Sequence, residues 1–262
     1  MWVGRVRAVD LLGPVFGLVF GLAFSAAAHA ADWHFGTEPF PPYTYALGGH
    51  AAGPMADVLQ TVCKRLQRRC VVDVMPWRRV LMLSENGELD GLFTVVDTPE
   101  RRAAFRISAP VIEARYMFFA FKSDRFAYRR PQDLSHRTVG VYGPSATATT
   151  LLPLLEGNEA RAVIEPDNAM VLRKMEARRY GDDGLVFMNE RVAEDLIARQ
   201  GLSDLRPAGE AARFTYSFGF VPKRVSAVEL AAFDAELAAL CRSGLLQRLL
   251  TPHRMQAPPC PR

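Results

Sequence analysis

Two arginines directly follow a Thr-Pro-Glu turn in the stretch "TVVDTPERRAAFRIS", residues 94–108. The apolar run before the turn has the composition of a strand, so the turn places Arg101 and Arg102 at the end of that strand. A guanidinium group stays charged and offers a planar fork of N–H donors that fits a carboxylate. The stretch therefore predicts a site for an anion.

Other residue types that carry chemistry do not form a comparable pattern. The histidines are scattered without the spacing of metal ligands, so we expect no metal site and no cofactor; they are His29, His34, His50, His136 and His253. No nucleophile, base and orienting group fall at a spacing that suits catalysis. We therefore expect a protein that is not an enzyme.

The four cysteines permit three pairings, and the sequence alone does not choose among them. Local geometry favours Cys63 with Cys70, because "CKRLQRRC" runs from the end of an expected helix to the next strand. Cys241 with Cys260 would then tie the proline-rich tail to the last helix. Disulfides of this kind require an oxidising compartment.

The first thirty residues have the features of a secretory signal peptide. Arg5 and Arg7 precede an apolar run, and small residues occupy both positions of a cleavage site, Ala28 and Ala30. A membrane anchor is the alternative reading, because the run is almost long enough to span a bilayer. We expect residues 1–30 to be removed and the rest to be periplasmic. The net charge of +4 is spread along the chain, which argues against nucleic acid as a partner.

The remaining chain alternates short apolar runs with helical patterns, as is typical of a sheet with crossover helices. We expect helices near residues 53–69, 77–87, 145–155, 189–201 and 226–250, with another beginning near 167. Long apolar strands near residues 115–122 and 214–221 separate two βαβ-like units. The pattern predicts two α/β lobes joined by two strand crossings, with a cleft between them. A single doubly wound sheet fits the same pattern and stays open as an alternative.

Three motifs resemble the bacterial extracellular solute-binding proteins of family 3, the polar-amino-acid-binding subunits of ABC importers. They are "TEPFPPYTY", "GELDGLFTVVDTPERRAAFRISAP" and "DLSHRTVGVYGPS". The "CKRLQRRC" spacing also resembles the disulfide of lysine/arginine/ornithine- and histidine-binding members. The resemblance implies a type II periplasmic-binding fold with two lobes and two hinge strands. We expect residues 31–119 and 217–262 to form lobe 1 and residues 120–216 to form lobe 2.

The resemblance also implies roles for single residues. The arginine of the family's turn binds the ligand's carboxylate, and Arg101 occupies that position, whereas Arg102 and Arg106 would lie on the outer face of a short helix. Phe40 and Trp77 match aromatic residues that line the pocket, although either could be part of a core. Two positions match hydroxyl groups that orient the ligand: Thr94, otherwise a plain strand residue, and Ser145, otherwise a helix cap.

Three departures argue against a standard amino-acid ligand. The family usually has an aspartate for the ligand's α-ammonium where this chain has Asn189, which brings no charge. Pro144 removes a backbone donor near the carboxylate site. Val96 stands where a serine is common. Glu38 or Glu190 is a candidate to restore the missing negative charge.

These features predict a monomeric periplasmic protein that closes on a small carboxylate-bearing solute and delivers it to an inner-membrane ABC permease. The ligand would be an amino acid or a close relative. Two alternatives remain. One is an enzyme on the same fold, such as a cyclohexadienyl or arogenate dehydratase, with Glu38, Glu190 or His50 as its acid. The other is a sensor that presents its bound ligand to a membrane receptor.

Overall fold

The computed structural model describes residues 1–4 and 31–260, which form a mixed α/β structure around one nine-stranded sheet. The predicted signal peptide of residues 1–30 lies almost wholly outside the described residues, and its removal stays a prediction. Within the described ranges, no helix combines the length and the apolar character needed to cross a membrane.

Eleven strands lie within the described residues. They are β1 (Trp33–Thr37), β2 (Tyr45–Leu47), β3 (His50–Ala52), β4 (Cys70–Val74), β5 (Gly91–Val96), β6 (Arg106–Ile107), β7 (Ile112–Phe121), β8 (Thr138–Tyr142), β9 (Arg161–Glu165), β10 (Leu185–Asn189) and β11 (Leu205–Phe220). The helices are α1 (Pro54–Arg65), α2 (Trp77–Asn86), α3 (Pro99–Ala104), α4 (Ala146–Leu155), α5 (Asn168–Glu176), α6 (Glu190–Gln200), α7 (Ala227–Arg242) and α8 (Leu245–Leu250).

One half of the sheet contains the strands β4, β1 and β5, which run parallel. Helix α1 connects β3 to β4 and starts with Pro54, whose missing N–H costs nothing in the first turn. Its apolar residues recur at helical spacing and are buried on one face, which fixes the helix against the sheet. The main ones are Met55, Val58, Leu59 and Val62.

The other half contains β10, β8 and β9, again parallel, with α4 and α5 as the crossover helices. Asp167 begins α5 by accepting a hydrogen bond of 2.6 Å from the backbone N–H of Met170. The carboxyl ends of β8, β9 and β10 therefore lie at the same edge of this half, next to the starts of α4, α5 and α6.

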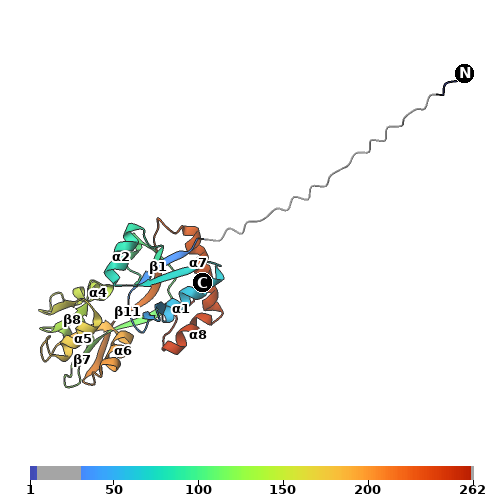
Figure 1. Cartoon of the computed structure of the whole chain (residues 1–262). Helices are drawn as coiled ribbons and strands as arrows, with labels where there is room; N and C mark the ends of the chain where they lie inside the picture. Colours follow the sequence, from blue (N-terminus) through green and yellow to red (C-terminus); the bar gives the residue numbers. More distant parts are fainter. Residues whose placement is uncertain (5–30, 261–262) are drawn as a thin grey trace.

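Strands β7 and β11 join the two halves, and both run antiparallel to their neighbours. β11 pairs with β7 over residues 205–216 and with β5 over residues 216–220, so one strand belongs to both halves. The sheet order is β4-β1-β5-β11-β7-β10-β8-β9. Figure 1 shows the two lobes, with α1, α2, α7 and α8 in one and α4, α5 and α6 in the other. The predicted two-lobed fold is confirmed, and the single doubly wound sheet is excluded by these two antiparallel strands.

Both disulfides have the predicted pairing. Cys63 and Cys70 are joined with a Cα–Cα distance of 6.1 Å, and Cys241 and Cys260 with 5.6 Å. The second bond fastens the C-terminal tail, whose Gln256 carbonyl accepts a hydrogen bond of 3.0 Å from the backbone N–H of Glu113 at the start of β7.

Two local features differ from the sequence-based expectation. Arg106 lies in strand β6, not on a helix, and its guanidinium donates to the carbonyls of Pro222 and Val225 at 2.9 and 2.7 Å. β11 begins at Leu205, about nine residues before the strand expected near residues 214–221. The added part becomes a strand because β7 supplies a pairing partner along its whole length.

Candidate functional site

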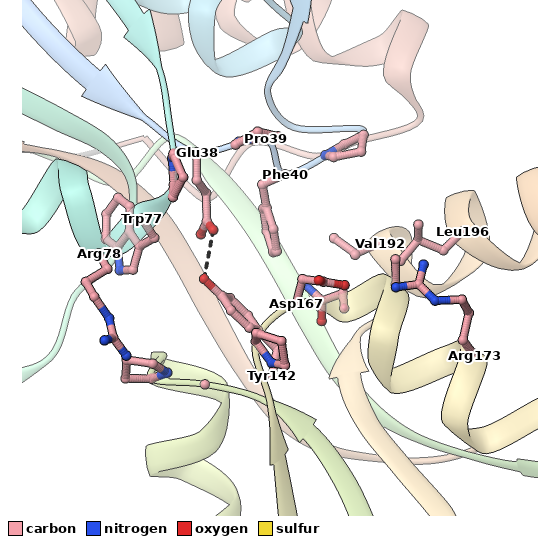
Figure 2. A pocket seen from close by; sticks show the side chains of 17 residues that line it. Glu38, Pro39, Phe40, Trp77, Arg78, Tyr142, Asp167, Arg173, Val192 and Leu196 are labelled. Atoms are coloured by element: carbon pink, nitrogen blue, oxygen red, sulfur yellow. Dashed lines mark hydrogen bonds between the residues drawn. The ribbon is translucent and has the colours of Figure 1, made fainter. Parts of the chain in front are cut away.

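Two adjoining cavities lie between the halves of the molecule. The smaller has a volume of about 40 Å³ and the larger about 850 Å³, and four residues line both: Glu38, Phe40, Trp77 and Tyr142. Six of the seven predicted ligand-binding residues line the smaller cavity: Glu38, Phe40, Trp77, Thr94, Arg101 and Ser145. The seventh, Asn189, lines neither cavity. Figure 2 shows the larger cavity, into which Phe40 points.

Helix α3 presents Arg101 to the smaller cavity. Thr98 begins this helix by accepting a hydrogen bond of 3.3 Å from the Arg101 backbone N–H. The guanidinium carbon lies 5.6 Å from the centroid of the Trp77 ring, and burial lowers the pKa of Arg101. Among residues 1–4 and 31–260, no group forms an ion pair or hydrogen bond with this guanidinium, whereas Arg102 is paired with Asp97. The donors of Arg101 are thus available to a ligand.

Aromatic side chains form the walls beside Arg101. Trp77 is the first residue of α2, and Phe40 follows the end of β1; both are buried except for the faces that line the cavities. The Phe40 ring stacks on Tyr43, with centroids 5.5 Å apart, and meets Tyr216 edge-on at 5.9 Å. These contacts fix the orientation of Phe40, so this wall is rigid.

Thr94 reaches the smaller cavity because the strand that carries it is irregular. Phe93 pairs with Phe218 and Val95 with Ser217, so Thr94 is the extra residue of a β-bulge in β5. Its φ of 65° is left-handed, a costly conformation for a β-branched residue. The Thr94 hydroxyl lies 3.1 Å from that of Thr44. Val96 lines the same cavity and offers it no polar group.

Glu38 and Tyr142 meet across the two halves of the molecule. Glu38 follows β1, whereas Tyr142 ends β8, and the tyrosine hydroxyl donates a hydrogen bond of 2.9 Å to Oε2 of Glu38 (Figure 2). Burial raises the pKa of Glu38 to about 7, although the hydrogen bond from Tyr142 opposes this change. Burial and the nearby Glu38 also raise the pKa of Tyr142. A carboxyl in this state is neutral in part of the molecules near pH 7.

Ser145 lines the smaller cavity, but its hydroxyl is already used. It donates a hydrogen bond of 2.6 Å to the carbonyl of Tyr142 and accepts one of 3.3 Å from the backbone N–H of Ala148. The side chain therefore caps α4. Thr147, the second residue of the same helix, lines the cavity with a second hydroxyl.

Asn189 is buried at the end of β10, behind Tyr216. Its Oδ1 accepts a hydrogen bond of 3.1 Å from the backbone N–H of Val192, which caps α6. Its Nδ2 donates to the hydroxyls of Tyr43 and Tyr216 at 3.1 and 3.0 Å. The Tyr216 hydroxyl in turn lies 2.5 Å from that of Tyr116. Asn189 thus belongs to a buried polar network and has no free side of its own.

Two other acid candidates lie away from both cavities described above. Glu190 binds Arg115 through two hydrogen bonds of 2.6 and 2.9 Å, beside the crossing strands. His50 is exposed on β3. Within the described ranges, no group of three or more His, Cys, Asp or Glu side chains is arranged to hold a metal ion.

The larger cavity is mainly apolar and continues outward from the smaller one. Its walls include Phe40, Trp77, Val192 and Leu196, together with five prolines: Pro39, Pro41, Pro76, Pro144 and Pro166. Charged side chains stand toward its rim, where Arg78, Asp167 and Arg173 are exposed (Figure 2). The cavity suits a ligand with an apolar body.

The sequence-based prediction missed the tyrosines of the site. Tyr116, Tyr142 and Tyr216 all line the smaller cavity with Thr147. Tyr142 had a usable signal, because it ends a strand of an α/β unit, and ligands bind at the carboxyl ends of such strands. Tyr116 is on β7 and Tyr216 on β11, and the pairing of these strands brings the two residues together although they are 100 positions apart in the sequence. Nothing in the local sequence indicates this contact.

A model of the bacterial extracellular solute-binding proteins, family 3, matches residues 34–254. No curated protein sequence matches the chain significantly. Several solved structures share its fold at low sequence identity. One is a histidine kinase sensor domain with similarity to periplasmic binding proteins: TM-score 0.74, 20% identity, 86% of this chain and 96% of that chain covered.

Two further solved structures are transport proteins. An amino-acid ABC transporter substrate-binding protein from Streptococcus pneumoniae, bound to L-arginine, has a TM-score of 0.72 at 22% identity and covers 85% of this chain and 94% of that chain. An arginine transport-system periplasmic binding protein from Legionella pneumophila has a TM-score of 0.72 at 18% identity. The match covers 85% of this chain and 99% of that chain. Since the family model spans most of the sequence and the fold agrees with it, the chain belongs to the bacterial extracellular solute-binding proteins, family 3.

Proposed function

We propose that this protein binds a small carboxylate-bearing solute in the periplasm and delivers it to an inner-membrane ABC permease. The observation that carries the proposal is the position of Arg101, whose guanidinium lies over Trp77 in the smaller cavity without a hydrogen-bond or ion-pair partner among the described residues. A partly buried, unpaired guanidinium favours an anion, and its donor fork favours a carboxylate.

The other cavity residues have supporting roles in this proposal. Phe40 and Trp77 hold the apolar part of the ligand between rigid aromatic walls. Thr94 orients the carboxylate with its hydroxyl, and Ser145 fixes the start of α4 beside the ligand. Glu38 lines the same cavity. The lobes, which we assign to residues 31–119 with 217–262 and to residues 120–216, close on the ligand by movement at β7 and β11.

The location and the partners are also proposals. Family membership and two disulfides support export to an oxidising compartment, with residues 1–30 as the signal peptide. We propose that the protein acts as a monomer with no cofactor, and that the permease recognises its closed form. The fold of the two transport proteins above supports this assignment.

The test compares Arg101→Ala with Arg102→Ala in the chain from residue 31 onward. Both arginines are on α3, but Arg102 is exposed and paired with Asp97, so its variant controls for loss of charge and helix content. Binding of amino acids, polyamines, and mono- and dicarboxylates is measured by thermal shift and calorimetry. Arg101→Ala should weaken carboxylate binding by about 10- to 100-fold, because it removes hydrogen bonds to a charged group. Equal affinity in the two variants would refute the proposal.

A sensor role is the second candidate, favoured by the similarity to a histidine kinase sensor domain. Deleting the gene distinguishes the two roles. Loss of ligand uptake supports transport, whereas intact uptake with loss of a ligand-dependent transcriptional response supports sensing. The catalytic alternative depends on Glu38, whose raised pKa suits a general acid. Ligand that is recovered unchanged after long incubation with the protein would exclude it.

A further inference from the structure

Asn189 ends β10 beside the tyrosines of the smaller cavity, and its hydrogen-bonding capacity is already used inside the protein. Its Oδ1 accepts from the backbone N–H of Val192, and its Nδ2 donates to Tyr43 and Tyr216. It is 2% exposed and lines neither cavity. Oδ1 also lies 3.2 Å from the Tyr43 hydroxyl, so both of its lone pairs face groups of the protein, and a ligand's ammonium group would have to displace one of them.

The described residues that line the smaller cavity also offer no carboxylate that is fully ionised near pH 7. Arg101 is its cation, and Glu38 is its one carboxyl group among the described residues. Oε2 of Glu38 accepts a hydrogen bond from Tyr142, and burial favours the neutral form of this carboxyl. The remaining polar lining consists of hydroxyl groups, including those of Thr94, Tyr116 and Thr147.

The charges of the cavity therefore suit a ligand that has one anionic group and no cationic group next to it. A carboxylate beside Arg101 forms an ion pair, and the hydroxyl groups can donate to it. An α-ammonium group would bring three N–H donors and a positive charge close to Arg101. Among the described lining residues, its desolvation would be compensated by hydroxyl oxygens or by Glu38, whose burial favours the neutral form.

We infer that the ligand is a carboxylic acid without an α-ammonium group, bearing hydrogen, hydroxyl or oxo at that carbon, with an apolar body that extends into the larger cavity. This inference rests on the proposed function, since it takes Arg101 as the carboxylate site. The shared walls, Phe40 and Trp77, lead from the smaller cavity into the larger one, which is about 850 Å³ in volume. The body would pass between them toward Val192 and Leu196.

The test uses matched sets of ligands that differ only at the α-carbon. The sets are phenylalanine, phenyllactate and phenylpropionate; leucine, hydroxyisocaproate and isocaproate; and arginine with guanidinovalerate. Calorimetry on the protein from residue 31 onward gives the dissociation constant of each. We expect at least one acid without the ammonium to bind about tenfold or more tightly than its amino acid, the scale of one poorly compensated charge. Tighter binding of the amino acids, or no binding in any set, overturns the inference.

Four variants separate this inference from the proposed function. Asn189→Asp restores a negative charge behind Tyr216 and should shift the preference toward the amino acids, whereas Asn189→Ser should not. Arg101→Ala should weaken every ligand in a set. If the amino acids bind more tightly and lose affinity in Arg101→Ala, the proposed function stands and this inference fails. If Arg101→Ala leaves all affinities unchanged, both fail. If Glu38→Gln abolishes the binding of amino acids alone, Glu38 pairs with their ammonium, and the inference is wrong.

Discussion

The hydroxyl of Tyr142 donates a hydrogen bond of 2.9 Å to the carboxyl of Glu38, and the two residues come from opposite lobes. Tyr142 ends a strand of one lobe, and Glu38 follows a strand of the other. The contact therefore links the lobes at the mouth of the smaller cavity. This contact between the lobes also depends on the protonation state of one carboxyl.

Stability should depend on pH through Glu38. Its pKa rises from an ordinary value of 4.5 to about 7 because of burial, so the folded protein binds this proton more tightly than the unfolded chain does. The stabilising contribution of protonated Glu38 is complete when the pH is below 4.5, the pKa of this group in the unfolded chain. It is lost as the pH rises through about 7, the pKa in the folded protein. The free energy of unfolding should fall by about 1 to 3 kcal/mol over that range, allowing for solvent screening.

Urea unfolding between pH 5 and 8 measures this dependence, with Glu38→Gln as the comparison. The amide does not titrate, so the variant should lose the part of the pH dependence that belongs to Glu38. If the free energy of unfolding changes with pH in the same way in both proteins, Glu38 has an ordinary pKa in the folded state and this prediction is wrong.

The left-handed conformation of Thr94 should make glycine more stable than alanine at this position. Its φ is 65°, and glycine adopts such a φ without steric cost, whereas alanine retains the clash of Cβ. The free energy of unfolding of Thr94→Gly should therefore be about 1 kcal/mol larger than that of Thr94→Ala. Both variants lose the hydroxyl near Thr44, so ligand affinity should fall in each. A less stable glycine variant would contradict this account of the bulge.

The buried tyrosine network should be sensitive to loss of a single oxygen. Tyr216→Phe leaves Nδ2 of Asn189 and the hydroxyl of Tyr116 each without one partner. We expect a loss of about 1 to 3 kcal/mol in the free energy of unfolding, the cost of leaving buried polar groups unpaired. Tyr45→Phe on β2, which is only partly buried, is the control and should be close to neutral. Equal effects in the two variants would refute the network's importance.

The two disulfides should differ in their contributions to stability. Cys241 and Cys260 are 19 residues apart in sequence, whereas Cys63 and Cys70 are 7 apart. The longer loop loses more entropy in the unfolded chain, so replacing its pair with serine should cost about 3 kcal/mol, against about 2 kcal/mol for the shorter. Chemical denaturation of the two double variants measures this order, and non-reducing peptide mapping verifies the pairing. A reversed order would point to strain or residual structure in one of the states.

The sequence predicted the core elements well where apolar periodicity and composition agreed. Strand β7 was expected near residues 115–122 and runs over Ile112–Phe121, and helices α1, α2, α4 and α6 lie within a few residues of their expected ranges. The β2–β3 hairpin was missed although its turn, Gly48-Gly49, is a strong hairpin signal. The first half of β11 was missed for a physical reason. It contains Pro207 and Gly209 and has two register shifts, so pairing with β7 makes it a strand against its own propensity.

In the candidate site, too, some features could be predicted from the sequence and others could not. The family resemblance indicated Arg101, Trp77 and Thr94 as site residues, and all three line one cavity. The state of Asn189 could not be read from the sequence, since it depends on Tyr43 and Tyr216, which are 146 and 27 residues away. The raised pKa of Glu38 likewise depends on burial between two lobes.

Strand β11 has a consequence for how the molecule melts. It is a single strand of 16 residues that pairs with β5 in one lobe and β7 in the other, and one apolar cluster contains both Phe35 and Val139. Neither lobe can lose its sheet without exposing part of the other's core. The two lobes therefore form one cooperative unit, and a single calorimetric transition is expected even though the ligand site divides them.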